Sequence, residues 1–296
     1  MKSYHIDMKT HAYNFNILQQ TIRSVKQNKI YLWQPGELLI PNIDPKEVAD
    51  FGHSIGKQVI TILNKDFYYF WAYKTVYHGG EPIGHNYNVR KCFTSLNGKK
   101  RYYRSHFVDT MAKYKLQYNN YISMNLWNWN NDDYPFQYIE NKPMILDGIG
   151  KSDYWNLPIS QLKDSMFSVV SESGITKEDF ITEKTWLPIF NKRPFVIFGP
   201  IGIHAKLKSI GFELFEEYFD YSFDKEHDYK TKAEDIIKQV AACEKMSYNK
   251  ALKKIKHKLE HNYNLLINKV RSGEWLPNLP IDKGPHAYLL NTVWTS

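Results

Sequence analysis

Short apolar runs alternate with helix-like patterns along most of the chain. Runs with the size and composition of buried strands occupy residues 29–33, 57–63, 91–96, 166–171 and 194–199. Helical signals lie between and after them, at an Asp-Pro start at 44–45, at 101–115, after Thr182, and at 204–210, 233–245 and 248–270. The aromatic segment 67–76 is expected to be extended. Buried strands that alternate with helices predict an α/β fold whose parallel sheets are covered on both faces.

A glycine-rich segment divides this alternation in two. Residues 78–86 (HGGEPIGHN) contain three glycines and a proline, which favour turns over regular structure. We therefore expect two Rossmann-like domains, 1–86 and 87–270, followed by a tail at 271–296. The first domain is short, so its Rossmann core is expected to be reduced. Helices near the C-terminus are expected to pack across both domains.

Composition narrows the class of protein. Of the 296 residues, 43% are hydrophobic and 24% are charged, which excludes a mainly disordered chain. Aromatic residues reach 16%, which suits a dense core and also stacking on sugars or bases. The net charge is +8, from 39 Lys and Arg against 31 Asp and Glu. This balance favours polyanionic partners such as nucleotide phosphates or nucleic acid, although a merely lysine-rich surface would produce it too.

The sequence predicts a soluble protein of the cytoplasm. No apolar run approaches the roughly 18 residues that span a bilayer, and the first residues lack the apolar stretch of a secretory signal. The two cysteines, Cys92 and Cys243, are too few for a disulfide framework or a zinc site. A reducing, intracellular setting is the simplest interpretation.

Several motifs of cofactor and metal chemistry are missing from the sequence. It contains no Walker A run, no GxGxxG, no HExxH and no Asp-x-Asp, and the run GIGKSD at 148–153 lacks the third glycine of a dinucleotide fingerprint. The neighbouring Asp132 and Asp133 could bind a cation, but the tip of a solvated loop is the simpler interpretation. We therefore expect no cofactor and no obligatory divalent metal.

The segment 167–202 joins two apolar strands through a loop and a short helix. The first strand delivers Glu172 at its carboxyl end, and the helix opens with Thr182, Glu183 and Lys184. Ligands of open α/β sheets bind beyond the carboxyl ends of the strands, and a helix N-terminus attracts phosphate. A cation in the first turn is disfavoured, and a bound diphosphate would remove that conflict. A threonine N-cap, a glutamate that complements the dipole and a solvated lysine are the alternative interpretation.

The same segment resembles the donor-binding segment of the fucosyltransferase and exostosin-like glycosyltransferases, through a Glu-Ser pair, an FITEK run and a strand that ends in glycine. That family has the GT-B fold of two Rossmann domains. The resemblance implies that Glu183 binds the ribose and that Lys184 binds the diphosphate of the donor. It also implies that Phe180 lies near the base and that Glu172 and Thr182 belong to the same donor site. Ser173 stands where the family has Asn, and Phe180 where Tyr is common. GDP-sugars and UDP-sugars are therefore both candidate donors.

A second resemblance lies upstream, in residues 94–104 (TSLNGKKRYYR). In the family, a strand that ends near Ser-Asn is followed by an arginine that opens a helix. This implies donor-binding roles for Asn97, Arg101 and Arg104. The planar fork of arginine suits this role because it binds phosphate oxygens bidentately. A basic turn of an exposed helix would have the same sequence.

A third resemblance lies in residues 30–42 (IYLWQPGELLIPN), where the family has a glutamate after a strand. It implies that Glu37 is the general base of an inverting transfer, which must take a proton from the acceptor hydroxyl. An exposed turn glutamate is the alternative. His78, Glu81 and His85, between the two expected domains, are weaker candidates for the acceptor side or for a rival base.

Together these patterns predict a metal-independent glycosyltransferase. It would transfer a sugar from a nucleotide-sugar donor, bound by the second domain, to a hydroxyl group of a glycan or another acceptor. One alternative is a DNA-modifying glycosyltransferase of viral type that acts on hydroxylated bases. Another is a non-catalytic nucleic-acid-binding protein on a degenerate transferase fold. The net charge and the lysines at 250–258 leave DNA open as a partner.

Overall fold

The chain divides into two compact units, which we call unit 1 (residues 1–77 and 269–296) and unit 2 (residues 78–268). The division falls where the glycine-rich segment 78–86 begins. The computed structural model describes residues 3–7, 15–26, 28–33, 45–62, 71–72, 75–76, 81–83, 88–97, 101–124, 134–139, 159–175, 181–272 and 274–275.

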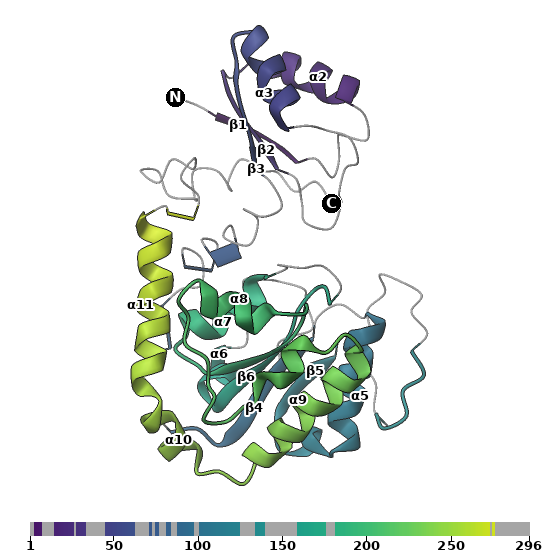
Figure 1. The fold of residues 1–296 in the computed structure, drawn as a ribbon, viewed down its shortest axis with the longest axis vertical. Coiled ribbons are helices and arrows are strands. Elements are labelled where there is room, and N and C mark those ends of the chain that lie inside the picture. Colours follow the sequence, from purple (N-terminus) through teal and green to yellow (C-terminus); the bar gives the residue numbers. More distant parts are fainter. Residues whose placement is uncertain are drawn as a thin grey trace. The chain divides into compact units, whose positions relative to one another are not determined.

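Unit 1 contains a three-stranded parallel sheet in the order β1-β2-β3 (Figure 1). Its described elements are β1 (Ser3–Asp7), α2 (Phe15–Ser24), β2 (Lys29–Trp33), α3 (Pro45–Ser54) and β3 (Gln58–Ile62). Its core joins the helices to the sheet through the buried residues Leu18, Ile22, Val25, Ile30, Val48 and Val59. The strands β2 and β3 and the helix start at Pro45 were predicted from the sequence, whereas β1 and α2 were not.

The expectation that the aromatic segment 67–76 is extended is wrong where the structure describes it. Trp71, Ala72, Thr75 and Val76 are helical. The Thr75 hydroxyl donates to the carbonyl of Trp71, 2.8 Å away, which is the spacing of one helical turn. The strand preference of aromatic residues is weak enough for local helical bonding to override it.

Unit 2 contains a four-stranded parallel sheet in the order β5-β4-β6-β7, a Rossmann-like α/β arrangement. The strands are β4 (Lys91–Asn97), β5 (Tyr121–Met124), β6 (Ser165–Ser171) and β7 (Phe195–Phe198). The α-helices are α5 (Tyr102–Lys113), α6 (Ile159–Lys163), α7 (Glu183–Phe190), α8 (Ile203–Ser209), α9 (Tyr229–Cys243), α10 (Tyr248–Lys254) and α11 (Lys256–Ser272), of which the residues from Lys269 onward fall in unit 1. Two short 3₁₀ helices are η1 (Leu116–Tyr118) and η2 (Tyr221–Lys225). The parallel α/β prediction is thereby confirmed for this sheet.

The strand order reverses beside β4. The chain leaves β4 through α5 to β5 on one side, and it later reaches β6 on the other side of β4. From β6 it continues through α7 to β7, away from β4. The crossovers β4–α5–β5 and β6–α7–β7 are both right-handed, as parallel strand connections are, and they run in opposite directions along the sheet. The helices α5 and α7 therefore lie on opposite faces of the sheet (Figure 1). A topological switch point therefore lies between the carboxyl ends of β4 and β6.

The phenylalanines account for much of the aromatic content in unit 2. Phe107 of α5 stacks on Phe198 of β7, with ring centroids 4.3 Å apart and planes 10° apart. Phe93 and Phe167 pair across β4 and β6 at 5.9 Å. Trp186 of α7 is fully buried. These rings form the core on both faces of the sheet and are not available for stacking on a ligand.

The long C-terminal helix expected at 248–270 is two helices. It breaks at Ile255, which ends α10 and leaves the following residue to begin α11. The apolar stripe predicted for it is nevertheless buried, at Leu252, Ile255, Leu259, Leu266 and Val270. Among the described helices, none is long and apolar enough to cross a membrane.

A buried polar network closes the β7 side of the sheet. The Nε2 atom of His204 accepts from the amide of Ile197 in β7 at 3.0 Å, so the proton of a neutral ring sits on Nδ1, which donates to Asp224 at 2.8 Å. Asp224 also accepts from the amides of His204 and Ala205, and Lys232 of α9 lies 3.8 Å away. Burial lowers the pKa of His204, although Asp224 works in the opposite direction. The imidazole therefore stays neutral inside the fold.

We predict that acid destabilises unit 2 through His204. The unfolded imidazole has a pKa of about 6.5 and the folded one a lower pKa, so the unfolded state takes up the proton first. The contribution of His204 to stability is complete above about pH 6.5 and is lost as the pH falls below it, with a slope approaching about 1.4 kcal/mol per pH unit. Urea denaturation at pH 7, 6 and 5 measures it.

The variant His204→Gln supplies the control, because an amide does not titrate in this range. The stability gap between wild type and variant should narrow as the pH falls. A gap that stays constant between pH 7 and pH 5 would contradict the neutral, buried imidazole.

Candidate functional site

Residues from three segments meet at the carboxyl ends of β4 and β6. Asn97 ends β4, and Arg101, Tyr103 and Arg104 open α5. The third segment runs from Glu172 and Ser173 after β6 to Thr182, Glu183 and Lys184 at the start of α7. We call these residues the switch-point cluster. Its position is where an open α/β sheet offers a ligand free loops and helix ends.

Glu172 is the centre of this cluster and is fully buried. Its carboxylate accepts hydrogen bonds from the Thr182 hydroxyl at 2.6 Å and the Thr185 hydroxyl at 2.6 Å. It also accepts from the amide of Thr182 at 3.0 Å and from that of Ser173 at 3.1 Å. A carboxylate has about four acceptor positions, and four protein donors fill them. Glu172 therefore ties the end of β6 to the N-terminus of α7 and has no acceptor position left for a ligand.

Gly199 makes room for this buried carboxylate side chain. A Cβ at Gly199 would lie 3.3 Å from the Cβ of Glu172 and 3.2 Å from the Cδ1 atom of Ile203. Both contacts are tighter than ordinary packing, so a larger residue would press on Glu172. The glycine at the end of the predicted strand 194–199 thus has a steric function.

Thr182 caps α7 as the sequence predicts. Its backbone is extended, and its hydroxyl accepts from the amide of Lys184 at 3.4 Å while it donates to Glu172. The negative charge of Glu172 lies against the first turn of α7, where the helix dipole is positive. The N-terminus of α7 therefore has an internal anionic partner.

Lys184 is also balanced inside the protein. Its ammonium group lies 2.6 Å from the carboxylate of Glu183 and 3.1 Å from the hydroxyl of Ser173. The side chains of Lys184 and Glu183 are 22% and 13% exposed. The cation in the first turn, which the sequence left unexplained, thus has a neighbouring carboxylate and needs no bound diphosphate. Both side chains still reach the surface.

Side chains at the start of α5 hold the loop after β6 by donating hydrogen bonds to the carbonyl oxygens of that loop. Arg101 and the hydroxyl of Tyr103 both donate to the carbonyl of Ser173, the latter at 2.6 Å. Arg104 donates to the carbonyl of Glu172 at 2.8 Å and is almost completely buried. Burial lowers the pKa of the Arg104 guanidinium from its very high ordinary value. An arginine can still be buried as a cation because its pKa is so high.

Asn97 has an unused acceptor in this cluster. It is fully buried, and its Nδ2 atom donates to the hydroxyl of Ser95 at 3.1 Å. Its Oδ1 atom is buried without a hydrogen-bond partner in the part of the chain that the structure describes. Leaving such an oxygen unbonded costs about 1–3 kcal/mol, so a donor group of a ligand would be favoured there.

The remaining predicted site residues are Glu37, His78, Glu81, His85 and Phe180. Glu81 is exposed. Glu37, His78, His85 and Phe180 lie outside the described residues.

Sequence reasoning missed Tyr103 and Ser173, which link α5 to the loop after β6. A signal was present, because Tyr103 lies between the two candidate arginines. Burial raises the pKa of the Tyr103 hydroxyl, which keeps it protonated as a donor.

The described residues were compared with the arrangements that bind metal ions and with those that activate thiols. Within the described ranges, no three side chains of His, Cys, Asp or Glu are arranged to hold a metal ion. The two cysteines are buried and free, and burial raises the pKa of Cys243 to about 11. A thiol with such a raised pKa is a poor nucleophile at neutral pH.

Comparison of the chain with known protein families, with curated proteins and with solved structures gives no match in any of the three.

We predict that Glu172→Gln destabilises unit 2 by about 2–5 kcal/mol, since the new NH₂ group faces buried donors that then lack an acceptor. Urea denaturation measures the loss. Glu81→Gln makes the same chemical change at an exposed position of the same unit and should stay within about 0.5 kcal/mol of wild type. Equal effects of the two substitutions would refute the anchoring role of Glu172.

Proposed function

We propose that the protein is a glycosyltransferase that uses a nucleotide-sugar donor. The observation that carries the proposal is the position of the switch-point cluster, at the topological switch point of a parallel sheet and beside the first turn of α7. Nucleotides bind to open α/β sheets at such switch points. In this proposal, unit 2 is the donor-binding half of a GT-B-like enzyme and unit 1 is the acceptor half.

The charges of the cluster suit a diphosphate. The cations Arg101, Arg104 and Lys184 outnumber the carboxylates Glu172 and Glu183, so the formal balance is positive. Arg101 and Lys184 would bind the phosphate oxygens, because both lie near the surface of the loop after β6. Arg104 and Glu172 would act by positioning this loop, since both are buried and bonded to it.

The carboxylate of Glu183 would turn from Lys184 to the ribose. In the absence of a ligand the two side chains neutralise each other at 2.6 Å. A diphosphate would take over Lys184 and release Glu183 to accept hydrogen bonds from ribose hydroxyls. The two residues would then act as a pair that exchanges an internal contact for contacts to the donor.

We propose an inverting transfer without a divalent metal. Arginine and lysine would neutralise the phosphate charge of the leaving nucleotide. Glu37 of unit 1 would take the proton of the acceptor hydroxyl, on the strength of the sequence resemblance. The acceptor would be a glycan or another hydroxyl compound.

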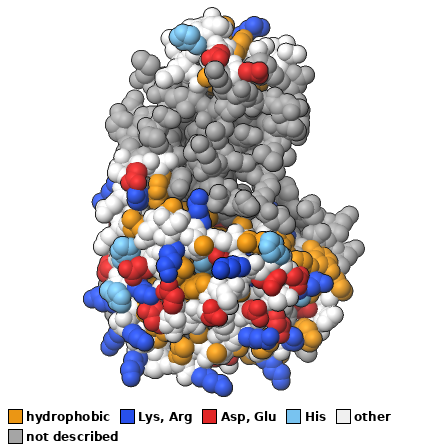
Figure 2. Space-filling view, in the orientation of Figure 1, with side chains coloured by type: hydrophobic (Ala, Val, Ile, Leu, Met, Phe, Trp, Pro, Cys, Tyr) orange, Lys and Arg blue, Asp and Glu red, His pale blue; other side chains and the backbone are white. Residues whose placement is uncertain are grey.

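A second candidate function is glycosylation of hydroxylated bases in DNA. Its support is a run of exposed lysines around α10 that carries no intervening acidic residue: Lys245, Lys250, Lys253, Lys254 and Lys256. Such a surface attracts phosphate backbones in a salt-dependent way. Elsewhere on the face seen in Figure 2, basic and acidic side chains of unit 2 are mixed. A binding protein without catalysis would show the same DNA affinity and no turnover of the donor.

We predict that Lys184→Ala weakens the binding of a nucleoside diphosphate by about 1.5–3 kcal/mol, the scale of a charge-assisted hydrogen bond. Titration calorimetry with UDP and GDP measures the affinity. Lys225→Ala removes an equal charge from an exposed position of the same unit and serves as the control. Unchanged affinity of the folded Lys184 variant would reject the donor site.

We predict that Glu37→Gln lowers turnover about 100- to 10,000-fold, the usual contribution of a positioned general base. Donor affinity should stay near the wild-type value, since Glu37 would act on the acceptor. Transfer assays with and without EDTA measure turnover, and oligosaccharides and hydroxylated duplex DNA are tested as acceptors. Turnover near the wild-type rate would exclude Glu37, and activity that is lost with EDTA and restored by manganese would exclude the metal-free mechanism.

A further inference from the structure

A separate cavity of about 240 Å³ lies between α5, α9 and the segment 134–138. On α5 its lining residues are spaced by three and four positions, as on one face of a helix: Tyr102, His106, Asp109, Thr110 and Lys113. We call it the tyrosine pocket, after Tyr102, Tyr134 and Tyr138. Its volume lies below the roughly 300–1,000 Å³ of most drug-sized ligand sites, so it suits a single ring.

A buried carboxylate fixes one wall of the tyrosine pocket. Asp109 is almost completely buried and accepts from the amides of Gln137 and Tyr138, each at 2.9 Å. The hydroxyl of Tyr134 lies 3.3 Å from the same carboxylate and 3.0 Å from Nδ1 of His106. These bonds fasten segment 134–138 to α5. The wall is therefore formed before any ligand binds, which lowers the entropic cost of binding.

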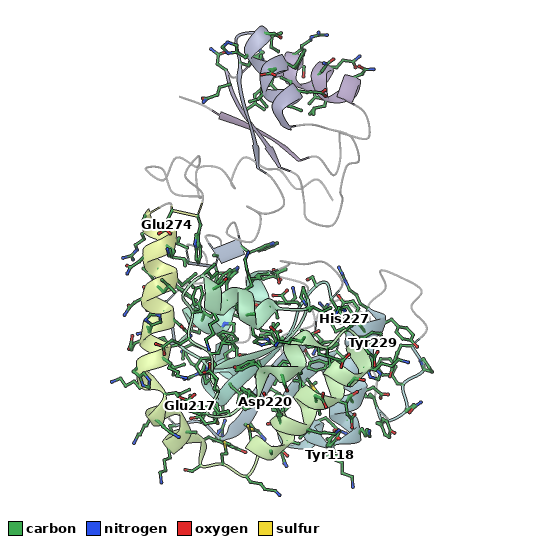
Figure 3. The ribbon with its side chains drawn as sticks, viewed as in Figure 1. Tyr118, Glu217, Asp220, His227, Tyr229 and Glu274 are labelled. Atoms are coloured by element: carbon green, nitrogen blue, oxygen red, sulfur yellow. The ribbon has the colours of Figure 1, made fainter. Side chains whose placement is uncertain are left out.

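The rings of the pocket meet their aromatic neighbours at steep angles, and two of its tyrosines are partly exposed. Tyr102 and Tyr134 have centroids 5.0 Å apart and planes at 75°. His106 meets Tyr229 at 5.7 Å and 89°, and Tyr229 is labelled in Figure 3 near the start of α9. Tyr102 and Tyr138 are 43% and 44% exposed, unlike the phenylalanines of the core. In Figure 2, hydrophobic side chains, among which tyrosine is counted, gather at the right-hand side of unit 2.

The charges around the pocket are mostly paired. Lys113 forms an ion pair with Glu234 at 3.0 Å, and Glu234 also accepts from the hydroxyl of Tyr114. The carboxylate of Asp109 is occupied by the segment that it holds. Burial and the nearby Lys230 lower the pKa of His106, so its ring is neutral. The lining thus combines ring faces, hydroxyls and compensated charges, without the excess of cations that a phosphate needs.

This chemistry matches a sugar ring. The C–H groups of a pyranose carry slight positive charge and pack on the negative face of a tyrosine, while its hydroxyls bond to carboxylate, ammonium and phenol groups at the rim. Planar bases prefer rings that stack in parallel on them. The rings here instead meet nearly at right angles, so they would contact one face and one edge of a puckered ring.

We propose that the tyrosine pocket binds one neutral sugar unit, as a glycan-binding subsite distinct from the switch-point cluster. It would hold one unit of a glycan on the α5–α9 side of unit 2. This inference does not depend on the proposed transferase activity, because a binding subsite requires no nucleotide.

The test is ligand-detected NMR titration of the full chain with methyl glycosides of glucose, galactose and mannose, with N-acetylglucosamine and with cellotriose. At least one of these probes should bind. Tyr138→Ala should weaken that binding by about three- to tenfold, the scale of one aromatic contact. This change leaves the backbone bond between Tyr138 and Asp109 in place. Tyr102→Phe should retain binding of the probe, whereas Tyr102→Ala should weaken that binding about as much as Tyr138→Ala does.

Tyr118→Ala is the matched control, since Tyr118 is 69% exposed and does not line the pocket (Figure 3). Its affinity for the same probe should equal that of wild type. Saturating UDP or GDP should leave sugar binding unchanged, which separates this subsite from the donor site. Absence of binding by every probe, or binding that Tyr138→Ala and Tyr102→Ala do not weaken, overturns the proposal. Tighter, tyrosine-dependent binding of adenosine or uridine would overturn it in favour of a base-binding pocket.

Discussion

The carboxylate of Glu172 is the constraint on which the switch-point cluster depends. A buried anion is costly unless every acceptor position is bonded, and here the Thr182 and Thr185 hydroxyls and two amides supply those bonds. The bonds set where α7 begins relative to the end of β6. Glu183 and Lys184 follow directly in the chain, so their places at the surface are consequences of the buried anchor.

This anchor changes how an anion would be bound beside α7. A free helix N-terminus would attract phosphate through its amides, but α7 already has the charge of Glu172 against its first turn. An incoming anion must therefore be attracted mainly by side-chain cations. Arg101 and Lys184 are suited to this because both contact Ser173, Arg101 from the N-cap of α5 and Lys184 from the first turn of α7. Their contacts to Ser173 keep both cations near the loop, so little side-chain entropy is left to lose on binding.

The sequence predicted the elements whose signals are local, and it missed those that depend on partners far along the chain. The strands β2, β4, β6 and β7 were evident as apolar runs, and Thr182 was evident as a cap. β5, with the sequence YISM, is too short to stand out, and it is a strand because it pairs with β4. The hydrogen bonds of Thr185 and Ser173 to Glu172 were likewise not predicted, because no local sequence pattern links these two residues to one carboxylate. The sequence placed Glu172 directly after the strand that forms β6 in the structure, but its bonding as an anchor required the tertiary structure.

The helix α5 contributes side chains to two different surfaces of unit 2, because its period directs neighbouring residues to different sides. Arg101 at the N-cap of α5 and Arg104 in its first turn both bond to the loop after β6. With 3.6 residues per turn, Tyr102, His106 and Asp109 follow one another on a different side of the helix from Arg104. The two arginines bond to the carbonyls after β6, and the other side forms the wall of the tyrosine pocket. Phe107 stacks on Phe198 in the core and so fixes the rotation of the helix about its axis. Any rotation of α5 about its axis that moved the arginines would also move the α5 residues that line the tyrosine pocket and would break the stack of Phe107 on Phe198. The core contact thus holds the two surfaces in a fixed relation within unit 2.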